Sequence, residues 1–330
     1  MGHRATQALY AAARLEIPDL LKDGEKSTAE LAELTATDKS ALARLMTVLT
    51  CLNVVARTGD ERFTLSEDGE FFLSDHPQTL RYYAIWLGSD WYWNPWADFI
   101  ETLRTGKPAF DRVNGSAWFD YLGKNPQAAD TFDRAMTVTA GIAGDALCES
   151  FDLSGFRTFV DVGGGCGKLL ARVLAQNPNL EGILFDLPRV VDEAGRYLGL
   201  LGLTSRVELV PGSFFEFVPK EADVYFLRHI VHDWGDVEVV KILTRCRQAM
   251  RPDSKLLIME RMDDPDQSNL STALTDLDLM VMLQGARERT RGEFRDLLER
   301  SGFEMESVTW TKAERYLIAA RPTMAYAHTR

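Results

Sequence analysis

Hydrophobic and polar positions from about residue 151 onward alternate between two kinds of segment. Short apolar runs predict strands, and longer stretches with apolar residues at helical spacing predict the helices between them. Repeated strand–helix–strand units indicate a doubly wound parallel sheet, which binds its ligand at the carboxyl ends of the strands. The predicted strands cover 158–162, 182–186, 207–210, 223–227 and 255–260, the helices 168–176, 189–200, 237–250, 271–284 and 292–301, and a closing hairpin 304–310 and 315–320.

The N-terminal part of the chain is mainly helical. Ser27-Thr28 is placed to cap a short helix, and Asp38 or Ser40 to cap a longer one. Two helices followed by a strand hairpin are typical of a winged helix. The predicted elements are helices over 4–22, with a break at Pro18, over 29–34 and up to Leu52, then strands over 54–55 and 62–65.

Net charge distinguishes between DNA binding and dimerisation, two functions that a winged helix can have. Residues 26–75 carry five basic and nine acidic side chains, a net charge of −4. A surface that contacts nucleic-acid phosphates needs the opposite sign. We therefore predict a dimerisation domain here, and a homodimer.

The whole chain is acidic, with a net charge of −12 and a pI near 5.0. This charge disfavours nucleic acid and anionic membranes as partners and suits an enzyme acting on small molecules. No apolar run approaches the roughly 18 residues of a membrane helix, and the N-terminus has no signal-peptide pattern. The four cysteines are far apart in the sequence, so we predict neither a zinc site nor disulfides. Reduced cysteines predict a cytoplasmic location.

At 330 residues the chain is long enough for more than one domain. We predict a winged-helix dimerisation domain over 1–90, a helical, aromatic-rich connector over 91–150 and a ligand-binding domain over 151–322. Five of the seven tryptophans lie between residues 86 and 118. Such rings pack as core or dimer interface, or some of them form the wall of a site for a flat aromatic substrate. Met136 is likewise either a core residue or part of the wall of that site.

A glycine loop connects the first strand of the predicted sheet to its helix. It has the sequence Asp161-Val-Gly-Gly-Gly-Cys-Gly167, and its glycines at 163, 165 and 167 allow positive φ angles and close approach of a ligand. Asp186 ends the next strand, 19 residues after Gly167, where an acid can bind a ribose hydroxyl. The loop lacks the G-x-G-x-x-G spacing of dinucleotide sites, so NAD and a turn that binds nothing are the weaker alternatives.

Candidate catalytic groups follow the later strands. His229 and His232 come after strand 223–227, Glu260 ends strand 255–260, and Glu288 follows the helix over 271–284. All can meet at the ligand-binding edge of the sheet. A neutral imidazole beside carboxylates can accept the proton of a hydroxyl nucleophile, although a lone glutamate at such a place is as readily a solvated loop-end charge.

Together these motifs resemble those of the S-adenosylmethionine (SAM)-dependent O-methyltransferases of the caffeic acid, acetylserotonin and polyketide-tailoring type. The other matching segments are Phe185-Asp-Leu-Pro188, Gly212-Ser-Phe-Phe215, Leu227-Arg-His-Ile-Val-His-Asp-Trp234 and Glu288-Arg-Thr290. The resemblance covers nearly the whole chain. It implies an α/β fold with a Rossmann-like, class I methyltransferase sheet after a winged-helix dimerisation domain.

The resemblance also implies residue roles. His232 would be the general base, flanked by Glu260 and Glu288, for methylation of a hydroxyl on an aromatic small molecule in secondary metabolism. The residues implied in SAM binding are Asp161, Gly163, Gly165, Gly167, Asp186, Leu187, Ser213, Phe214 and Arg228. The residues implied in acceptor binding are Met136, Asp233, Asp278 and Met282.

Two departures keep other functions open. Ser213 stands where many members have an acid for the adenine amine, and a few relatives perform decarboxylation or hydroxylation in the same pocket. The alternatives are therefore such a non-methylating relative, or a non-catalytic winged-helix regulator. No aspartate cluster at the sheet edge suggests a magnesium site, so no metal is predicted.

Overall fold

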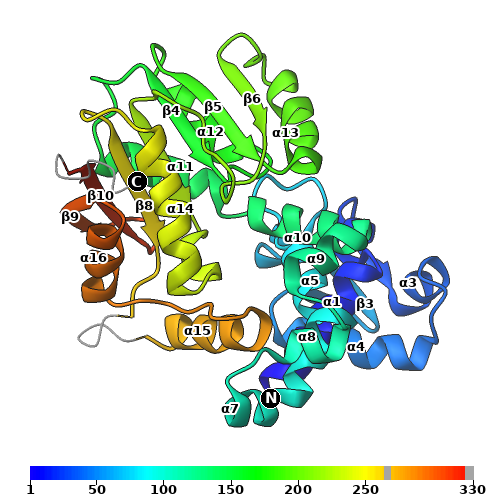
Figure 1. Cartoon of the computed structure of the whole chain (residues 1–330). Helices are drawn as coiled ribbons and strands as arrows, with labels where there is room; N and C mark the ends of the chain where they lie inside the picture. Colours follow the sequence, from blue (N-terminus) through cyan, green and yellow to red (C-terminus); the bar gives the residue numbers. More distant parts are fainter. Residues whose placement is uncertain (264–268, 324–330) are drawn as a thin grey trace. The chain divides into compact units, whose positions relative to one another are not determined.

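The computed structural model describes residues 1–263 and 269–323 of the chain, which fold into two compact units (Figure 1). Unit 1 contains residues 1–98 and 110–138, and unit 2 contains residues 99–109 and the chain from 139 onward. This division places part of the predicted 91–150 connector in each unit. The three-domain description, 1–90, 91–150 and 151–322, stays a prediction.

Unit 1 is mainly helical and carries one small sheet, with strand order β1-β3-β2. The predicted helix over 4–22 is interrupted at Glu16, whose φ of 56° is left-handed, while Pro18 lies in the first turn of α2, where its missing N–H costs nothing. Its elements are α1 (Gly2–Arg14), α2 (Ile17–Leu21), β1 (Lys26–Ser27), α3 (Thr28–Leu34), α4 (Lys39–Cys51), β2 (Val55–Gly59), β3 (Arg62–Leu65), η1 (Asp68–Phe72), α5 (Arg81–Gly88), α6 (Asp90–Trp93), η2 (Asn94–Asp98), α8 (Ala109–Asn114), α9 (Trp118–Lys124) and α10 (Pro126–Thr137).

Side-chain caps set the helix starts of the winged-helix part. Ser27 and Glu30 form a reciprocal capping box at α3, and Asp38, not Ser40, caps α4 by accepting from the Ala41 N–H at 2.8 Å. The strand β1, which has two residues, was not predicted, because so short a strand has no periodicity of its own. Helices and strands enclose a core that includes Ala12, Ile17, Leu21, Leu31, Leu42, Met46, Leu49, Val54 and Phe63.

Aromatic rings form a second packed region of unit 1. Trp86, which is 8% exposed, and Trp118, which is 4% exposed, lie 6.3 Å apart between ring centroids. Both rings also make edge-to-face contacts with Phe132 on α10, at 5.3 and 5.4 Å. These residues therefore form core, as one of the two sequence interpretations predicts.

Unit 2 is built on a seven-stranded sheet with the order β6-β5-β4-β7-β8-β10-β9. The first five of these strands are parallel, and β10 runs antiparallel to both β8 and β9. All five parallel strands lie within one residue of their predicted ends. The strands are β4 (Thr158–Val162), β5 (Glu181–Asp186), β6 (Val207–Pro211), β7 (Val224–Arg228), β8 (Lys255–Glu260), β9 (Phe303–Trp310) and β10 (Tyr316–Pro322).

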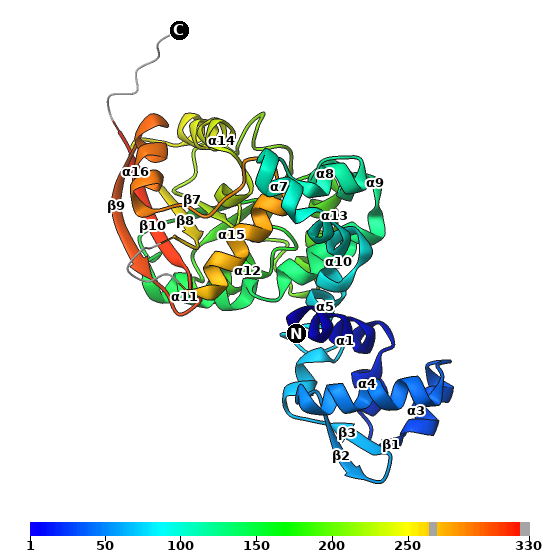
Figure 2. The ribbon, with the colours of Figure 1, turned by 90° about the horizontal axis from the view of Figure 1, so that it is seen from below.

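Alternating side chains of each strand point to opposite faces of this sheet. On one face Val160, Tyr225 and Leu227 belong to a core with α14 and α16, and on the other Phe159 and Phe226 pack with α11, α12 and α13. Figures 1 and 2 show these helices around the strands. The helices of unit 2 are α7 (Phe99–Thr105), α11 (Ala140–Ser150), α12 (Lys168–Gln176), α13 (Pro188–Leu200), η3 (Val231–Asp233), α14 (Asp236–Ala249), α15 (Leu270–Met282) and α16 (Arg291–Arg300).

The predicted fold class is therefore confirmed. Because β4, β5, β7 and β8 are parallel neighbours, their carboxyl ends meet at one edge of the sheet and bring together segments that are distant in sequence. Across the described residues, no helix is both long enough and apolar enough to cross a membrane.

Candidate active site

The glycine loop lies at the carboxyl end of β4 and folds back against β5. The N–H of Gly163 donates to the carbonyl of Phe185 at 2.8 Å, and all three glycines have positive φ angles, of 75°, 57° and 80°. A Cβ at Gly163 would collide with Ile230, and one at Gly167 with Leu184. A Cβ at Gly165 would instead enter open space, with no described atom within 4 Å apart from those of Gly165 and its two chain neighbours. Two glycines therefore permit packing, and the third leaves room for a ligand.

Asp186 ends β5 directly beside this loop. Its Oδ2 accepts from the Gly165 N–H at 2.9 Å and its Oδ1 from the Leu187 N–H at 2.7 Å. Burial raises the pKa of the Asp186 carboxyl, and these two backbone hydrogen bonds oppose that shift. Each carboxylate oxygen keeps further acceptor capacity for ligand hydroxyls. Leu187, which follows, is 42% exposed.

The loop's first acid, Asp161, is 3% exposed, and its Oδ2 has no hydrogen-bond partner among the described residues. Burial raises its pKa to about 7, while the positive charge of Arg228 lowers it. Arg228, at the end of β7, donates to the Thr139 hydroxyl, and burial lowers its own pKa to about 10. This oxygen of Asp161 therefore keeps its capacity to accept a hydrogen bond.

The turn after β6 packs beside Asp186. The Gly212 N–H donates to the carbonyl of Asp186 at 2.9 Å, which brings Ser213 and Phe214 to the same edge. The Ser213 hydroxyl accepts from the Phe215 N–H at 3.3 Å, so it stabilises its own turn.

The turn that carries His232 begins where β7 ends. His229 has a left-handed φ of 53°, so the chain turns sharply out of the strand. The next two N–H groups, of Ile230 and Val231, both donate at 2.9 Å to Oε1 of Glu260 at the end of β8. Glu260 therefore fixes the start of the short η3 helix, on which His232 lies.

Three carboxylates surround the His232 imidazole. Its Nδ1 is 3.1 Å from Glu288 Oε1 and 3.6 Å from Glu260 Oε2, and its Nε2 is 3.5 Å from Asp233 Oδ1. Burial alone would lower the pKa of this imidazole, but the charges of Glu260, Asp233 and Glu288 outweigh burial and raise it to about 10. Burial raises the pKa of Asp233 to about 7.

The structure thus brings His232, Glu260, Glu288 and Asp233 into one cluster, as the sequence predicts for the first three. Asp233 was predicted to face an acceptor and lies against the imidazole itself. Asp278 and Met282 lie on α15, half-buried and 2% exposed respectively. Met136 lies on α10 of unit 1.

Several residues that support the cluster were not recognised from the sequence. Asp276 on α15 accepts from the Glu288 N–H at 2.7 Å, and Arg315 donates from Nε to Nε2 of His229 at 3.2 Å. Burial holds the pKa of His229 well below its usual value, so this ring is neutral and can accept that bond. Neither contact has a local sequence signal, because each partner lies on a distant segment.

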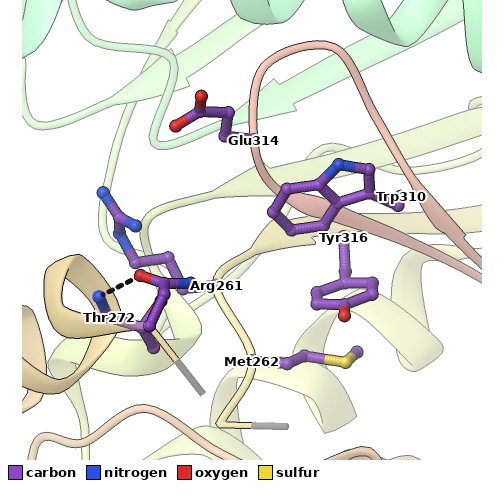
Figure 3. A pocket seen from close by; sticks show the side chains of 7 residues that line it. Arg261, Met262, Thr272, Trp310, Glu314 and Tyr316 are labelled. Carbon is purple, nitrogen blue, oxygen red and sulfur yellow. Dashed lines mark hydrogen bonds between the residues drawn. The ribbon is translucent and has the colours of Figure 1, made fainter. Parts of the chain in front are cut away.

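A small cavity of about 20 Å³ opens elsewhere in unit 2, where β8 continues into Arg261 and Met262 and meets the β9–β10 hairpin. Figure 3 shows Trp310 and Tyr316 on one side of it, and Asn269 accepts from the Thr272 N–H at 2.9 Å beside it. This volume holds about one water molecule. It is too small for an aromatic acceptor.

Sheet order, glycine loop and strand-end acid together define the class I methyltransferase fold. Two family models match the chain: an O-methyltransferase domain over residues 96–304, and an O-methyltransferase dimerisation domain over residues 1–75. The chain therefore belongs to the O-methyltransferase family. It is an enzyme that transfers a methyl group to oxygen, which confirms the family and activity predicted from its motifs.

Individual relatives agree with this assignment. The chain is 37% identical over 306 residues to the mitomycin biosynthesis 6-O-methyltransferase of Streptomyces lavendulae, covering 92% of this chain and 87% of that one. The crystal structure of LaPhzM is 35% identical, with a TM-score of 0.94, covering 98% of this chain and 96% of the other. NcsB1, an O-methyltransferase from neocarzinostatin biosynthesis solved with SAM and 2-hydroxy-5-methyl naphthoic acid, is 26% identical with a TM-score of 0.81, covering 96% and 95%.

Proposed function

We propose that this chain uses SAM to methylate a hydroxyl group on an aromatic small molecule, with His232 as the general base. The observation that carries the proposal is the buried cluster in which Glu288 and Glu260 lie against Nδ1 of His232. We assign Nε2 as the nitrogen that accepts the proton, because Nδ1 is hydrogen-bonded to Glu288 at 3.1 Å, whereas Asp233 lies 3.5 Å from Nε2.

The residues at the ends of β4 and β5 fit SAM. Asp186 can accept hydroxyl donors of a ribose, the space at Gly165 admits a ligand against the backbone, and the unsatisfied oxygen of Asp161 suits an ammonium group. We assign Gly163, Gly167, Leu187, Ser213, Phe214 and Arg228 to the surroundings of the same site. When bound, SAM supplies an electrophilic methyl group on a positively charged sulfur.

His232 matches the chemistry of a phenolic acceptor. An ordinary imidazole, with a pKa near 6.5, is about 3.5 units too weak a base for a phenol of pKa about 10, a mismatch of about 5 kcal/mol. The carboxylates raise the pKa of His232 to about 10 and so remove this mismatch. When the ring of His232 is neutral, the proton can then move from the phenol oxygen to Nε2 at little cost, which leaves a nucleophilic oxygen.

The same carboxylates also limit how much of the His232 imidazole is neutral. An imidazole with so high a pKa is mostly protonated at pH 7, so the neutral form becomes more abundant as pH rises.

We assign the acceptor to the region around Asp233, Asp278 and Met282 of unit 2. An aromatic acceptor is supported by the naphthoic acid in the NcsB1 structure. The dimerisation-domain match supports a homodimer, which light scattering at micromolar concentration tests. We place the reaction in the cytoplasm, as the reduced state expected of four scattered cysteines suggests.

The test is incubation of the purified chain with methyl-labelled SAM and a panel of phenols, naphthols and polyketide phenols. Mass spectrometry should find products heavier by one labelled methyl group on oxygen, formed together with demethylated cofactor. Products that have lost carbon dioxide or gained a hydroxyl, or cofactor binding without any acceptor turnover, would contradict the proposal.

A further inference from the structure

Arg289 follows Glu288 in the chain and is completely buried, with 0% exposure. Its guanidinium donates to the carbonyl of Val231 at 2.8 Å and to the carbonyl of Trp234 at 2.7 Å. It also donates twice to Oδ1 of Asp236, from Nε at 3.1 Å and from a terminal nitrogen at 2.8 Å. Arg289 thus bonds both ends of the turn that contains His232.

The backbone around Arg289 reinforces this link. The N–H of Arg287 donates to the carbonyl of His232 itself at 3.0 Å. On the other side, Arg289 forms a parallel bridge with Met262, and its carbonyl accepts from the Asp263 N–H at 3.1 Å. The segments that carry His232, Glu260 and Glu288 therefore all meet at this arginine.

A buried guanidinium is costly unless its donors and its charge are satisfied. Here every guanidinium nitrogen has a partner, and Asp236 balances the charge. A lysine presents one ammonium group and cannot bond two carbonyls and a carboxylate in this fixed planar arrangement. The geometry is thus specific to arginine.

We propose that Arg289 is a positioning residue for methyl transfer: it holds the Val231–Trp234 turn so that the His232 imidazole stays against Glu288 and Glu260. This role rests on the proposed function of His232 as the base. Arg289 touches neither that ring nor a reacting atom, and it acts only through the backbone on either side of His232.

The chain contains a matched control for a purely structural arginine. The guanidinium of Arg206 also donates to backbone carbonyls, those of Leu174 at 3.2 Å, Asn177 at 2.7 Å and Leu180 at 2.6 Å. None of these residues belongs to the His232 cluster. Arg206→Lys should therefore cost stability without changing the catalytic base.

The experiment compares Arg289→Lys, Arg206→Lys and His232→Gln in the full chain. Three quantities are measured for each: kcat per folded enzyme at saturating SAM, the SAM dissociation constant, and the pKa of His232 by NMR of labelled histidine rings. Among the signals of the five histidines, that of His232 is identified by its absence from the spectrum of His232→Gln. The groups that face the His232 ring are Glu260, Asp233, Glu288 and the ring of His229, whose centroid is 5.3 Å away.

Arg289→Lys should lower kcat by roughly 10- to 100-fold, because small misplacements of a catalytic group have effects of this size. It should leave SAM affinity within about twofold and lower the pKa of His232, since the ring loses contact with the carboxylates that favour its protonated form. Arg206→Lys should leave kcat and the His232 pKa unchanged. If Arg289→Lys does not fold, Asp236→Asn, which removes the charge of the carboxylate in the same clamp and keeps the arginine, should show the same two changes, with a smaller loss of kcat that is still at least about threefold.

Unchanged kcat and His232 pKa in Arg289→Lys, beside a strongly impaired His232→Gln, would overturn the positioning role and leave the proposed function standing. Equal losses in Arg289→Lys and Arg206→Lys would likewise reduce Arg289 to a structural residue. Near-normal turnover in His232→Gln would overturn the base assignment, and the positioning role with it.

Discussion

Two regions at the same edge of the sheet are built in opposite ways. At β4 and β5 the site consists mainly of backbone N–H groups and glycines with positive φ, together with Asp186, whose oxygens accept from that backbone, and the buried Asp161. At β7 and β8 it consists of buried ionisable side chains, with three carboxylates within 3.6 Å of one imidazole. The first region is suited to holding a ligand, and the second to controlling a proton.

The comparison predicts a clean separation of mutant effects. Changes in the glycine-loop region should alter SAM affinity and leave turnover at saturation nearly intact. Changes in the His232 cluster should alter turnover and leave SAM affinity nearly intact.

The largest effect is expected from His232→Ala. Removing a positioned base should lower kcat by roughly 10²–10⁴-fold, while calorimetry should find SAM affinity unchanged within about twofold. A variant that loses SAM binding as strongly as turnover would show that the two regions are not separate.

Asp186→Ala should have the next largest effect, on the other side of the comparison. Charged hydrogen bonds contribute roughly 1.5–3 kcal/mol, so the SAM dissociation constant should rise roughly 10- to 100-fold, as measured by calorimetry. Asp223 is the matched control, because it also accepts from two backbone N–H groups, of Arg157 at 2.7 Å and Thr158 at 2.9 Å, before β7 begins. Asp223→Ala should lower stability and spare SAM binding; equal affinity losses would contradict the assignment.

Glu288→Gln should lower kcat by roughly tenfold, less than loss of the base itself, because the carboxylate acts on the imidazole. It should also lower the pKa of His232. The three carboxylates raise that pKa above 6.5, to about 10, so a protonated ring contributes stability below pH 6.5 that is lost as pH rises through the folded-state value. Removing one carboxylate moves this loss to lower pH. NMR titration of His232 in the cofactor-free protein checks the sign, and an unchanged or raised value would contradict it.

The smallest effect is expected from Gly165→Ala, which places a methyl group in the open space of the loop. SAM affinity should fall several-fold, and the left-handed φ should cost about 1–2 kcal/mol of stability. Gly202→Ala is the control: its φ is 70° and its Cβ would also meet no atom within 4 Å, but it lies between α13 and β6. The two variants should lose similar stability in chemical denaturation, and only Gly165→Ala should lose SAM affinity.

Much of the first region could be predicted from the sequence, because its determinants are contiguous. The strand, the three glycines and the next strand-end acid lie within 29 residues, from Thr158 to Asp186. The positions of the five parallel strands were accurate for the same reason: β-branched and aromatic runs of five or six residues carry their own signal. The break predicted at Pro18 lies at Glu16 instead, because Pro18 is a local sequence signal and a left-handed glutamate is not.

In the second region, the sequence predicts only the base, His232, and its flanking acids, Glu260 and Glu288. Its support depends on contacts between distant segments, such as Arg289 with Val231 and Trp234, which are 58 and 55 residues away in sequence. No local pattern marks an arginine as fully buried, since arginines are mostly exposed. The protonation of the cluster also depends on burial, which sequence spacing does not give.

The most direct test of His232 as the base is the ratio of wild-type to His232→Gln turnover across acceptors that differ in hydroxyl pKa. At pH 8 and saturating SAM, the ratio should be roughly 10²–10⁴ for phenols of pKa about 10. It should fall towards one for nitrophenols that are already ionised at this pH, since they need no base. A ratio that stays constant across the series would show that His232 shapes the pocket and does not accept the proton.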